Sequence, residues 1–342
     1  MGKIQVSYEI QRELTGVLER PPSYQIEKVA NQDYLWKKVI ADLFTDFLLF
    51  FLPDFHMEVD FSKPVEFLQQ ELFKEIMDER KGLRRTDQLV KVQLKNGEEK
   101  WVLVHIEVQT QDEKGFAKRV FEYFYRIYDR YEQKIVAIAL FTNTSKKSTN
   151  TYNYLYFGTE LSYTFNKYVL ADFDESELQT SSKLFSKALL VAMYLNKTKN
   201  NVSQRTLLKE QLLKEITRIQ GIDATEMEAL FYFTDYLLTL PKEFTQKINQ
   251  EILQFIRKED VRMESIRRDD LSPTLAYVYE KIYEDGLEKG VSQGIERGIE
   301  QGIEQKTYQV VINLIKNGFE DEVIANLAEI SIEQVQEIRA NY

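Results

Sequence analysis

The spacing of apolar residues changes along the first half of the chain. Residues 24–80 carry apolar side chains at intervals of three and four, which is typical of helices packed on one face. Two β-prone runs follow, 87–95 and 101–108, and Asn96-Gly97 lies between them. Asn-Gly is a strong short-range hairpin signal, so the pattern predicts helices followed by a β-hairpin.

The pattern then returns to helix and ends in further strands. Residues 116–131 have helical spacing, and 135–141 form a continuous apolar run of the kind found in strands buried on both faces. Residues 161–166 alternate apolar and polar side chains, which indicates one more strand. The order helix, hairpin, helix, strand, strand predicts an α/β domain over 24–175 with a mixed β-sheet flanked by helices.

Residues 176–285 have helical patterning almost throughout, which predicts an all-helical region. Glycine then recurs every four residues within 286–305, and an aliphatic residue follows each glycine: Leu287, Val291, Ile295, Ile299 and Ile303. Each interior glycine costs a helix about 1 kcal/mol relative to alanine. Small residues allow a partner helix to approach closely, so the repeat favours a homo-oligomer, although a flexible helical spacer fits equally well.

The last segment, 306–342, predicts short helices, and the box Ser331-Ile332-Glu333-Gln334 marks the start of the final one. Two short helices across a tight turn resemble a helix-turn-helix. However, Arg339 is the only cation of the last helix, which also carries Glu333 and Glu337. Because DNA phosphates would repel that surface, we expect a small helical packing or oligomerisation module. Residues 1–23 form an N-terminal extension.

Composition narrows the possible chemistry. The 342 residues include no cysteine and two histidines, and the net charge is −10. Thiolate nucleophiles, disulfides and cysteine-ligated zinc are therefore excluded, and carboxylates are the expected catalytic groups. The longest apolar stretch, 43–52, is interrupted by Asp46 and is too short to span a membrane. With no signal-peptide pattern at the start, we expect a cytoplasmic protein that does not contact membranes.

Two acidic residues stand out in the predicted hairpin. The second strand ends in Glu107 and Gln109, on a face where a core strand would stay apolar. A two-residue loop would set Asp87 opposite Ile106, and a loop extending to Glu99 would set it opposite Val108. Two carboxylates this close repel each other unless a cation lies between them or one is protonated, and oxygen ligands suit Mg²⁺ or Mn²⁺.

A structural interpretation of the same residues is also possible. Asp87 would then simply begin a strand, and Glu107 would form an ion pair with Lys91 or Arg85. His105 shares the face of Glu107 but is more typical of a packed core histidine.

The residues resemble a known family. Asp87, a hairpin and then Glu107-Val108-Gln109 have the form of the PD-(D/E)xK nuclease motif. With the runs DQLVKV at 87–92, VHIEVQ at 104–109 and YFYRI at 123–127, and with the glycine tail, the chain is similar to the Rpn family of bacterial recombination-promoting nucleases, or PD-(D/E)xK putative transposases.

The resemblance implies a restriction-endonuclease-like fold and Mg²⁺-dependent hydrolysis of DNA phosphodiester bonds. Asp87 and Glu107 would hold the metal, and Gln109 would occupy the position where the superfamily usually has lysine. A further acid often comes from a preceding helix, for which Glu71 is the first candidate and Asp33 the second. Spacing along the following helix allows Lys118, Arg119, Tyr123 and Arg126 to share a face, which either contacts DNA phosphates or is simply the solvated side of the helix.

The charge distribution fits a DNA substrate. Residues 80–134 include 13 basic and 9 acidic residues, whereas the rest of the chain is strongly acidic. A local basic surface can bind DNA on an acidic protein. Two alternatives to a nuclease stay open: a DNA-binding or regulatory protein on a catalytically degenerate fold, and a scaffold acting through its helical half and tail.

Overall fold

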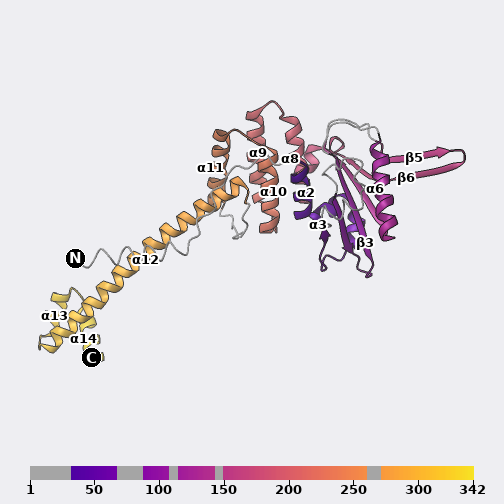
Figure 1. The fold of residues 1–342 in the computed structure, drawn as a ribbon. Helices are drawn as coiled ribbons and strands as arrows, with labels where there is room; N and C mark the ends of the chain where they lie inside the picture. The colour runs from indigo at the N-terminus through magenta and orange to yellow at the C-terminus, as the bar shows by residue number, and fades with distance from the viewer. Residues whose placement is uncertain (1–31, 68–87, 108–114, 143–148, 260–270) are drawn as a thin grey trace, which may run out of the picture. The chain divides into compact units, whose positions relative to one another are not determined.

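The computed structural model describes residues 32–67, 88–107, 115–142, 149–259 and 271–342 (Figure 1). The chain divides into two compact units, Met1–Tyr277 and Val278–Tyr342. The first unit contains the sheets and most of the helices, and the second is helical. The protein is therefore mixed α/β with a helical C-terminus, as the hydrophobic pattern predicts.

The main sheet has five strands in the order β1-β2-β3-β4-β7 (Figure 1). β1, β2 and β3 pair antiparallel, whereas β3, β4 and β7 pair parallel. Helix α6 connects β3 to β4, as a crossover between parallel strands requires. The bounds are β1 Glu66–Phe67, β2 Gln88–Gln93, β3 Glu99–Glu107, α6 Phe116–Tyr131, β4 Ile135–Phe141 and β7 Asn166–Val169.

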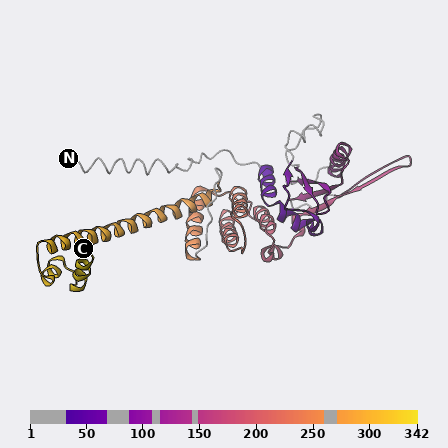
Figure 2. The same ribbon diagram turned by 90° about the horizontal axis from the view of Figure 1, so that it is seen from below.

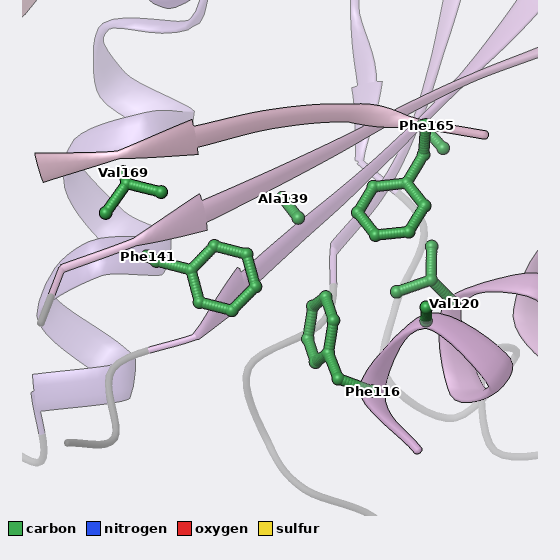
Figure 3. Close-up of a cluster of buried hydrophobic side chains, with 8 residues drawn as sticks. Phe116, Val120, Ala139, Phe141, Phe165 and Val169 are labelled. Carbon is green, nitrogen blue, oxygen red and sulfur yellow. The ribbon is translucent and has the colours of Figure 1, made fainter. Parts of the chain in front are cut away.

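Alternate residues of β7 show that helices cover both faces of this sheet. Val169 packs in a cluster with Phe116 and Val120 of α6 (Figure 3). Its neighbour Tyr168 points to the other face, where its hydroxyl donates to the carbonyl oxygen of Phe51 in α3 and its ring centroid lies 4.5 Å from that of Phe51. The mixed sheet is thus the middle of three layers. The first helices are α2 Gln32–Asp42, α3 Phe44–Phe51 and α4 Pro53–Glu58.

The structure corrects the interpretation of 24–80 as wholly helical. Glu66 and Phe67 form the short edge strand β1, which pairs with Lys91 and Val90. Val59 makes a further antiparallel bridge to Leu94. A two-residue strand carries no periodicity of its own, so the helical spacing around it hid it.

The register of the β2–β3 hairpin also differs from both predictions. The predicted loops would set Gln88 opposite His105 or Glu107, but Gln88 pairs with Val104. Leu94 N–H donates to Glu98 O at 2.7 Å, which closes a loop of three residues. Gly97 has φ +84°, the left-handed conformation that three-residue hairpin loops need at their last position.

Two strands form a separate antiparallel pair, β5 Thr151–Tyr156 and β6 Thr159–Thr164. We call this pair, with its turn Phe157-Gly158, the arm; it extends from the sheet domain in both views (Figures 1 and 2). The pattern predicts the strand at 161–166 but not β5 or the separate strand β7. The predicted run therefore covers the last four residues of β6 and the first residue of β7, which belong to different sheets.

The rest of the first unit is helical. After η1 Leu170–Asp172 come α7 Glu175–Thr180, α8 Phe185–Lys197, α9 Val202–Thr217, α10 Ala224–Leu237 and α11 Lys242–Lys258. A buried ion pair joins Lys209 of α9 to Asp235 of α10 at 2.9 Å. Asp235 also accepts hydrogen bonds from the backbone N–H and the hydroxyl of Thr274 at 2.9 Å, so a polar network holds the first turn of α12.

Helix α12, Pro273–Lys316, is a single 44-residue helix that contains the glycine repeat. Two short helices follow, α13 Asp321–Ala328 and α14 Ile332–Asn341. They pack on the end of α12 through a small core of Val311, Ile324, Ala325 and Val335. The predicted capping box is confirmed, because Ser331 Oγ accepts from Gln334 N–H at 3.2 Å and Gln334 Oε1 accepts from Ser331 N–H at 2.9 Å. No helix in the described ranges has the length and apolar character needed to cross a membrane.

Candidate functional site

The candidate site lies at the edge of the sheet where β3 ends. Glu107 is the last residue of β3 and pairs with Phe141, the last residue of β4. The antiparallel pairing of Gln88 with Val104 brings the beginning of β2 to the same edge. Asp87, Gln109 and Glu71 lie outside the described residues. Among residues that are described, no group of three or more His, Asp or Glu could hold a metal ion.

The beginning of β2 is attached to α2 by a long-range contact. Gln88 Nε2 donates to the carbonyl oxygen of Lys37 at 3.1 Å, which joins segments 51 residues apart. Asp33 lies four residues before Lys37, one turn earlier on the helix and about 6 Å along its axis. The structure therefore attaches the middle of α2 to the strand that begins directly after Asp87, with Asp33 one turn further toward the start of that helix.

The pairing does not favour an ion pair between Glu107 and Lys91. Lys91 pairs with Trp101, six residues before Glu107, which is about 20 Å along a strand. The ammonium of Lys91 instead lies 3.9 Å from the carboxylate of Glu66 on β1. Arg85, the other partner considered for Glu107, lies outside the described residues.

Helix α6 presents its predicted DNA contacts in two directions. Arg119, Tyr123 and Arg126 are spaced by four and three residues and share one half-buried flank. The guanidinium of Arg119 lies 5.2 Å from the ring centre of Phe116, and this stacking fixes its direction. Lys118 is exposed on a different side of the helix, 3.8 Å from the carboxylate of Glu122. The four residues therefore do not form a single patch.

The opposite flank of α6 is aromatic and contacts the arm. The ring centroid of Phe121 lies 5.2 Å from that of Tyr152, and the centroid of Phe124 lies 4.8 Å from that of Tyr163. Burial in this contact raises the pKa of the Tyr163 phenol far above its ordinary value, so the group stays neutral. A hollow of about 350 Å³ lies at the root of the arm, lined by Asn150, Thr164, Phe165, Asn166, Lys167 and Tyr168.

The sequence interpretation missed two features of this region. The contact of Gln88 with α2 has no local signal, because it depends on how two distant segments pack. The arm did carry a signal, since Tyr152, Tyr154 and Tyr156 alternate with polar or aliphatic residues in the manner of a strand.

Comparison with known proteins agrees with the resemblance drawn from the sequence. A family model described as "Putative transposase, YhgA-like" matches residues 33–244. The match begins in α2, includes the sheet and the arm, and ends at the beginning of α11. No curated protein and no solved structure matches the chain. Because the family model covers more than half of the 342 residues, the chain belongs to the YhgA-like family of putative transposases.

Proposed function

We propose that the protein is a Mg²⁺-dependent DNA endonuclease that hydrolyses phosphodiester bonds, with a role in recombination or the processing of mobile DNA. Membership of a transposase-like family supports DNA as the partner. The pairing of Gln88 with Val104 carries the proposal, because it brings the residue after Asp87 to the edge where Glu107 ends β3. A mixed sheet with helices on both faces fits a restriction-endonuclease-like fold.

The proposed metal ligands are Asp87 and Glu107. Both supply carboxylate oxygen, the donor that Mg²⁺ and Mn²⁺ prefer, and the chain has no cysteine to compete for the ion. A bound Mg²⁺ would lower the pKa of a water molecule and neutralise charge on the phosphate. Gln109 has a neutral amide, so its role in this proposal is to orient the attacking water.

The contact between Gln88 and Lys37 favours Asp33 over Glu71 as the additional acid. Asp33 lies one turn from the carbonyl that accepts the hydrogen bond of Gln88, so its helix is attached to the strand that Asp87 precedes. A carboxylate there could bind the metal directly or through a water molecule. Arg119 of α6 is a proposed phosphate contact, because that helix begins close to the same edge of the sheet. Arg126 lies on the same flank about 10 Å further along the helix and would contact a phosphate farther from the edge.

The experiment is conversion of supercoiled plasmid to nicked and linear forms by the purified full chain, with Mg²⁺, with Mn²⁺ or with EDTA. We expect cleavage with either metal and none with EDTA. Asp87→Ala and Glu107→Ala should each abolish it. Glu98→Gln is the matched control, because Glu98 is exposed beside the loop at the other end of the hairpin, and this variant should retain full activity.

Each outcome has a separate meaning. Equal nicking by wild type and by both alanine variants would identify a contaminating nuclease and overturn the proposal. DNA binding without cleavage by pure wild type would support the alternative of a degenerate nuclease fold with a binding or regulatory role. Asp33→Asn and Glu71→Gln, assayed together, decide which acid contributes, since only the contributing residue should lower the rate.

For the glycine repeat we propose that α12 pairs with α12 of a second copy of the chain. The five aliphatic residues that follow the glycines are 51–61% exposed. A Cβ atom built on any of Gly286, Gly290, Gly294, Gly298 and Gly302 would meet nothing within 4 Å, so the fold of one chain does not require them. A period of four exceeds 3.6, so the stripe drifts by about 40° per repeat, and a partner would have to wrap in a right-handed sense.

Light scattering after size-exclusion chromatography tests this association. We expect the full chain to have at least twice the monomer mass, and Ile295→Asp/Ile299→Asp to shift it to the mass of one chain. Glu296→Gln is the control, because it changes a neighbouring residue of the same repeat without adding charge to the stripe. A wild-type chain that is monomeric at all concentrations would overturn the proposed association.

A further inference from the structure

The arm is a two-faced hairpin, and α6 covers one of its faces only at the root. Tyr152 pairs with Tyr163 and Tyr154 pairs with Leu161, so these four residues lie on one apolar face of the hairpin. Phe121 and Phe124 of α6 pack on Tyr152 and Tyr163. Beyond this contact the same face continues into solvent, where Tyr154 is 45% exposed. The described residues therefore leave the outer half of an aromatic face uncovered.

The residue at the tip of the arm is not the type that this kind of turn prefers. Phe157 and Gly158 have φ values of 42° and 82°, so both central residues of this two-residue turn are left-handed. Such turns prefer asparagine or glycine, and a bulky side chain with positive φ is strained. Phe157 is also 93% exposed, and its ring packs against that of Tyr156, with centroids 4.7 Å apart. Folding of the arm gives no reason for phenylalanine here.

The charge of the arm shows what kind of contact it can make. Between Thr151 and Thr164 the sequence carries one charged residue, Glu160, and no cation. The arm therefore offers no cation to a phosphate, whereas α6, which packs on its root, carries four basic and two acidic residues. An uncharged aromatic tip fits a contact with DNA bases, while the phosphates would contact basic residues of α6 on the sides that the arm leaves open.

The arm is rooted close to the candidate site. Phe116, at the beginning of α6, has its ring centroid 4.8 Å from that of Phe141, the residue paired with Glu107. The same ring lies 6.0 Å from that of Phe165, where the arm joins β7. Figure 3 shows these three rings beside one another. From this root, six residues per strand give the arm a reach of about 20 Å.

We propose that the arm is a base-contacting element for duplex DNA, in which Tyr156 and Phe157 insert into a groove and unstack a base step next to the cleavage site. Apolar and aromatic side chains act as wedges of this kind in other DNA-binding proteins. The proposal rests on the proposed function, because it takes the substrate of the candidate site to be DNA. It adds that recognition of this substrate includes deformation of the duplex.

The test uses the full chain with EDTA, so that no hydrolysis occurs, and a fluorescein-labelled 25-base-pair duplex containing 2-aminopurine. Wild type should bind this duplex and raise the 2-aminopurine fluorescence, which reports unstacking. Phe157→Asn suits the left-handed turn and should leave the thermal midpoint equal or higher. Alone or with Tyr156→Thr, it should weaken binding by about 5- to 100-fold and abolish the fluorescence rise.

Salt dependence separates base contacts from phosphate contacts. The slope of log K against log salt should be unchanged in the tip variants, because the tip releases no counterions, whereas Arg126→Ala should reduce it by about one. Leu207→Asn is the control, because Leu207 is also an exposed apolar residue, on α9, and this variant should bind DNA as wild type does.

The outcomes distinguish this inference from the function on which it rests. A wild type that neither binds nor cleaves duplex DNA would overturn the proposed function. A wild type that binds and cleaves while the tip variants match it in affinity and fluorescence would overturn the arm's role alone. Tip variants with normal DNA binding but a lower mass by light scattering would also overturn it, and would assign the arm to contact between copies of the chain.

Discussion

Helices α6 and α12 both carry regularly spaced apolar residues, but they use them differently. On α6, Phe116, Val120 and Ile127 are buried against the sheet. In the glycine repeat of α12, Ile295 and Ile299 are 59% and 58% exposed. The first helix thus completes the fold of its own unit, whereas the second keeps its apolar stripe available for another molecule.

This difference means that α6 and the glycine repeat of α12 meet different structural requirements. A residue that positions catalytic groups must be held rigidly, which the packed core between α6 and β4 provides. A residue that recognises a second copy has to stay accessible in the single chain. The comparison predicts that substitutions near α6 act on folding, whereas substitutions in the repeat of α12 act on association.

The largest effect should come from Phe116→Ala. Removing a buried ring between α6, β4 and the root of the arm should lower the free energy of unfolding by about 3–5 kcal/mol. Denaturant titration followed by circular dichroism measures it. Tyr125→Ala, on the exposed side of the same helix, should change stability by less than about 0.5 kcal/mol. Equal effects of the two substitutions would break the comparison, since α6 would then have no buried side.

A similar loss is expected for Lys209→Met in the helical region. The side chains of Lys209 and Asp235 are 3% and 2% exposed, so the substitution would leave a buried carboxylate without its cation. Removing one partner of such a pair costs about 3–5 kcal/mol. Lys214→Met is the control on the same helix, because its ion pair with Glu210 is half-buried and should contribute less than about 1 kcal/mol. A stability of Lys209→Met equal to that of the control would show that the network is not needed.

In α12, substitutions in the glycine repeat should raise stability rather than lower it. Gly294→Ala/Gly298→Ala should stabilise the helix by about 1 kcal/mol per site, because alanine has the higher helix propensity and each added Cβ meets open space. The same methyl groups should hold a partner helix further away and weaken association. Helical ellipticity and mass, measured on one sample across a dilution series, test both parts together. Unchanged association would show that the glycines are not at the contact.

The smallest effect concerns pH. Burial raises the pKa of Asp46 in α3 above its ordinary 3.8, and the nearby carboxylate of Asp223 adds to the shift. The folded chain therefore binds this proton more tightly than the unfolded chain, so stability falls as pH rises from about 3.8 through the folded pKa. Asp46→Asn should flatten this fall and raise the thermal midpoint at pH 7.

Asp54→Asn, at an exposed position of α4, is the control and should leave the thermal midpoint at pH 7 within about 1 °C of wild type. A lower midpoint at pH 7 for Asp46→Asn would show that the ionised carboxylate is stabilising, which contradicts the account.

Strong periodicity made some elements predictable. The bounds of α6 and β4 were predicted to the residue, because the first has an apolar stripe and the second a continuous apolar run. β1 has two residues, too few for any pattern. β5 escaped prediction because a polar stretch before it dominated the local signal. The hairpin register depended on one extra loop residue, and Asn96-Gly97 allows both loop lengths.

The candidate site was predictable from the sequence only in part. Glu107 was placed correctly at the end of a strand, since alternation identifies which positions depart from a core pattern. The contact between Gln88 and Lys37 could not be predicted, because contacts between residues 51 positions apart depend on tertiary packing. Asp87, Gln109 and Glu71 stay predictions.

The central claim is that Glu107 and its neighbours hold a divalent metal where β3 ends. Titration of the full chain with Mn²⁺, followed by electron paramagnetic resonance of the free ion, tests it most directly. The account predicts saturable binding by wild type and by Glu98→Gln, and binding weakened by more than about tenfold in Glu107→Gln. Equal Mn²⁺ binding by wild type and Glu107→Gln, or none by wild type, would contradict it.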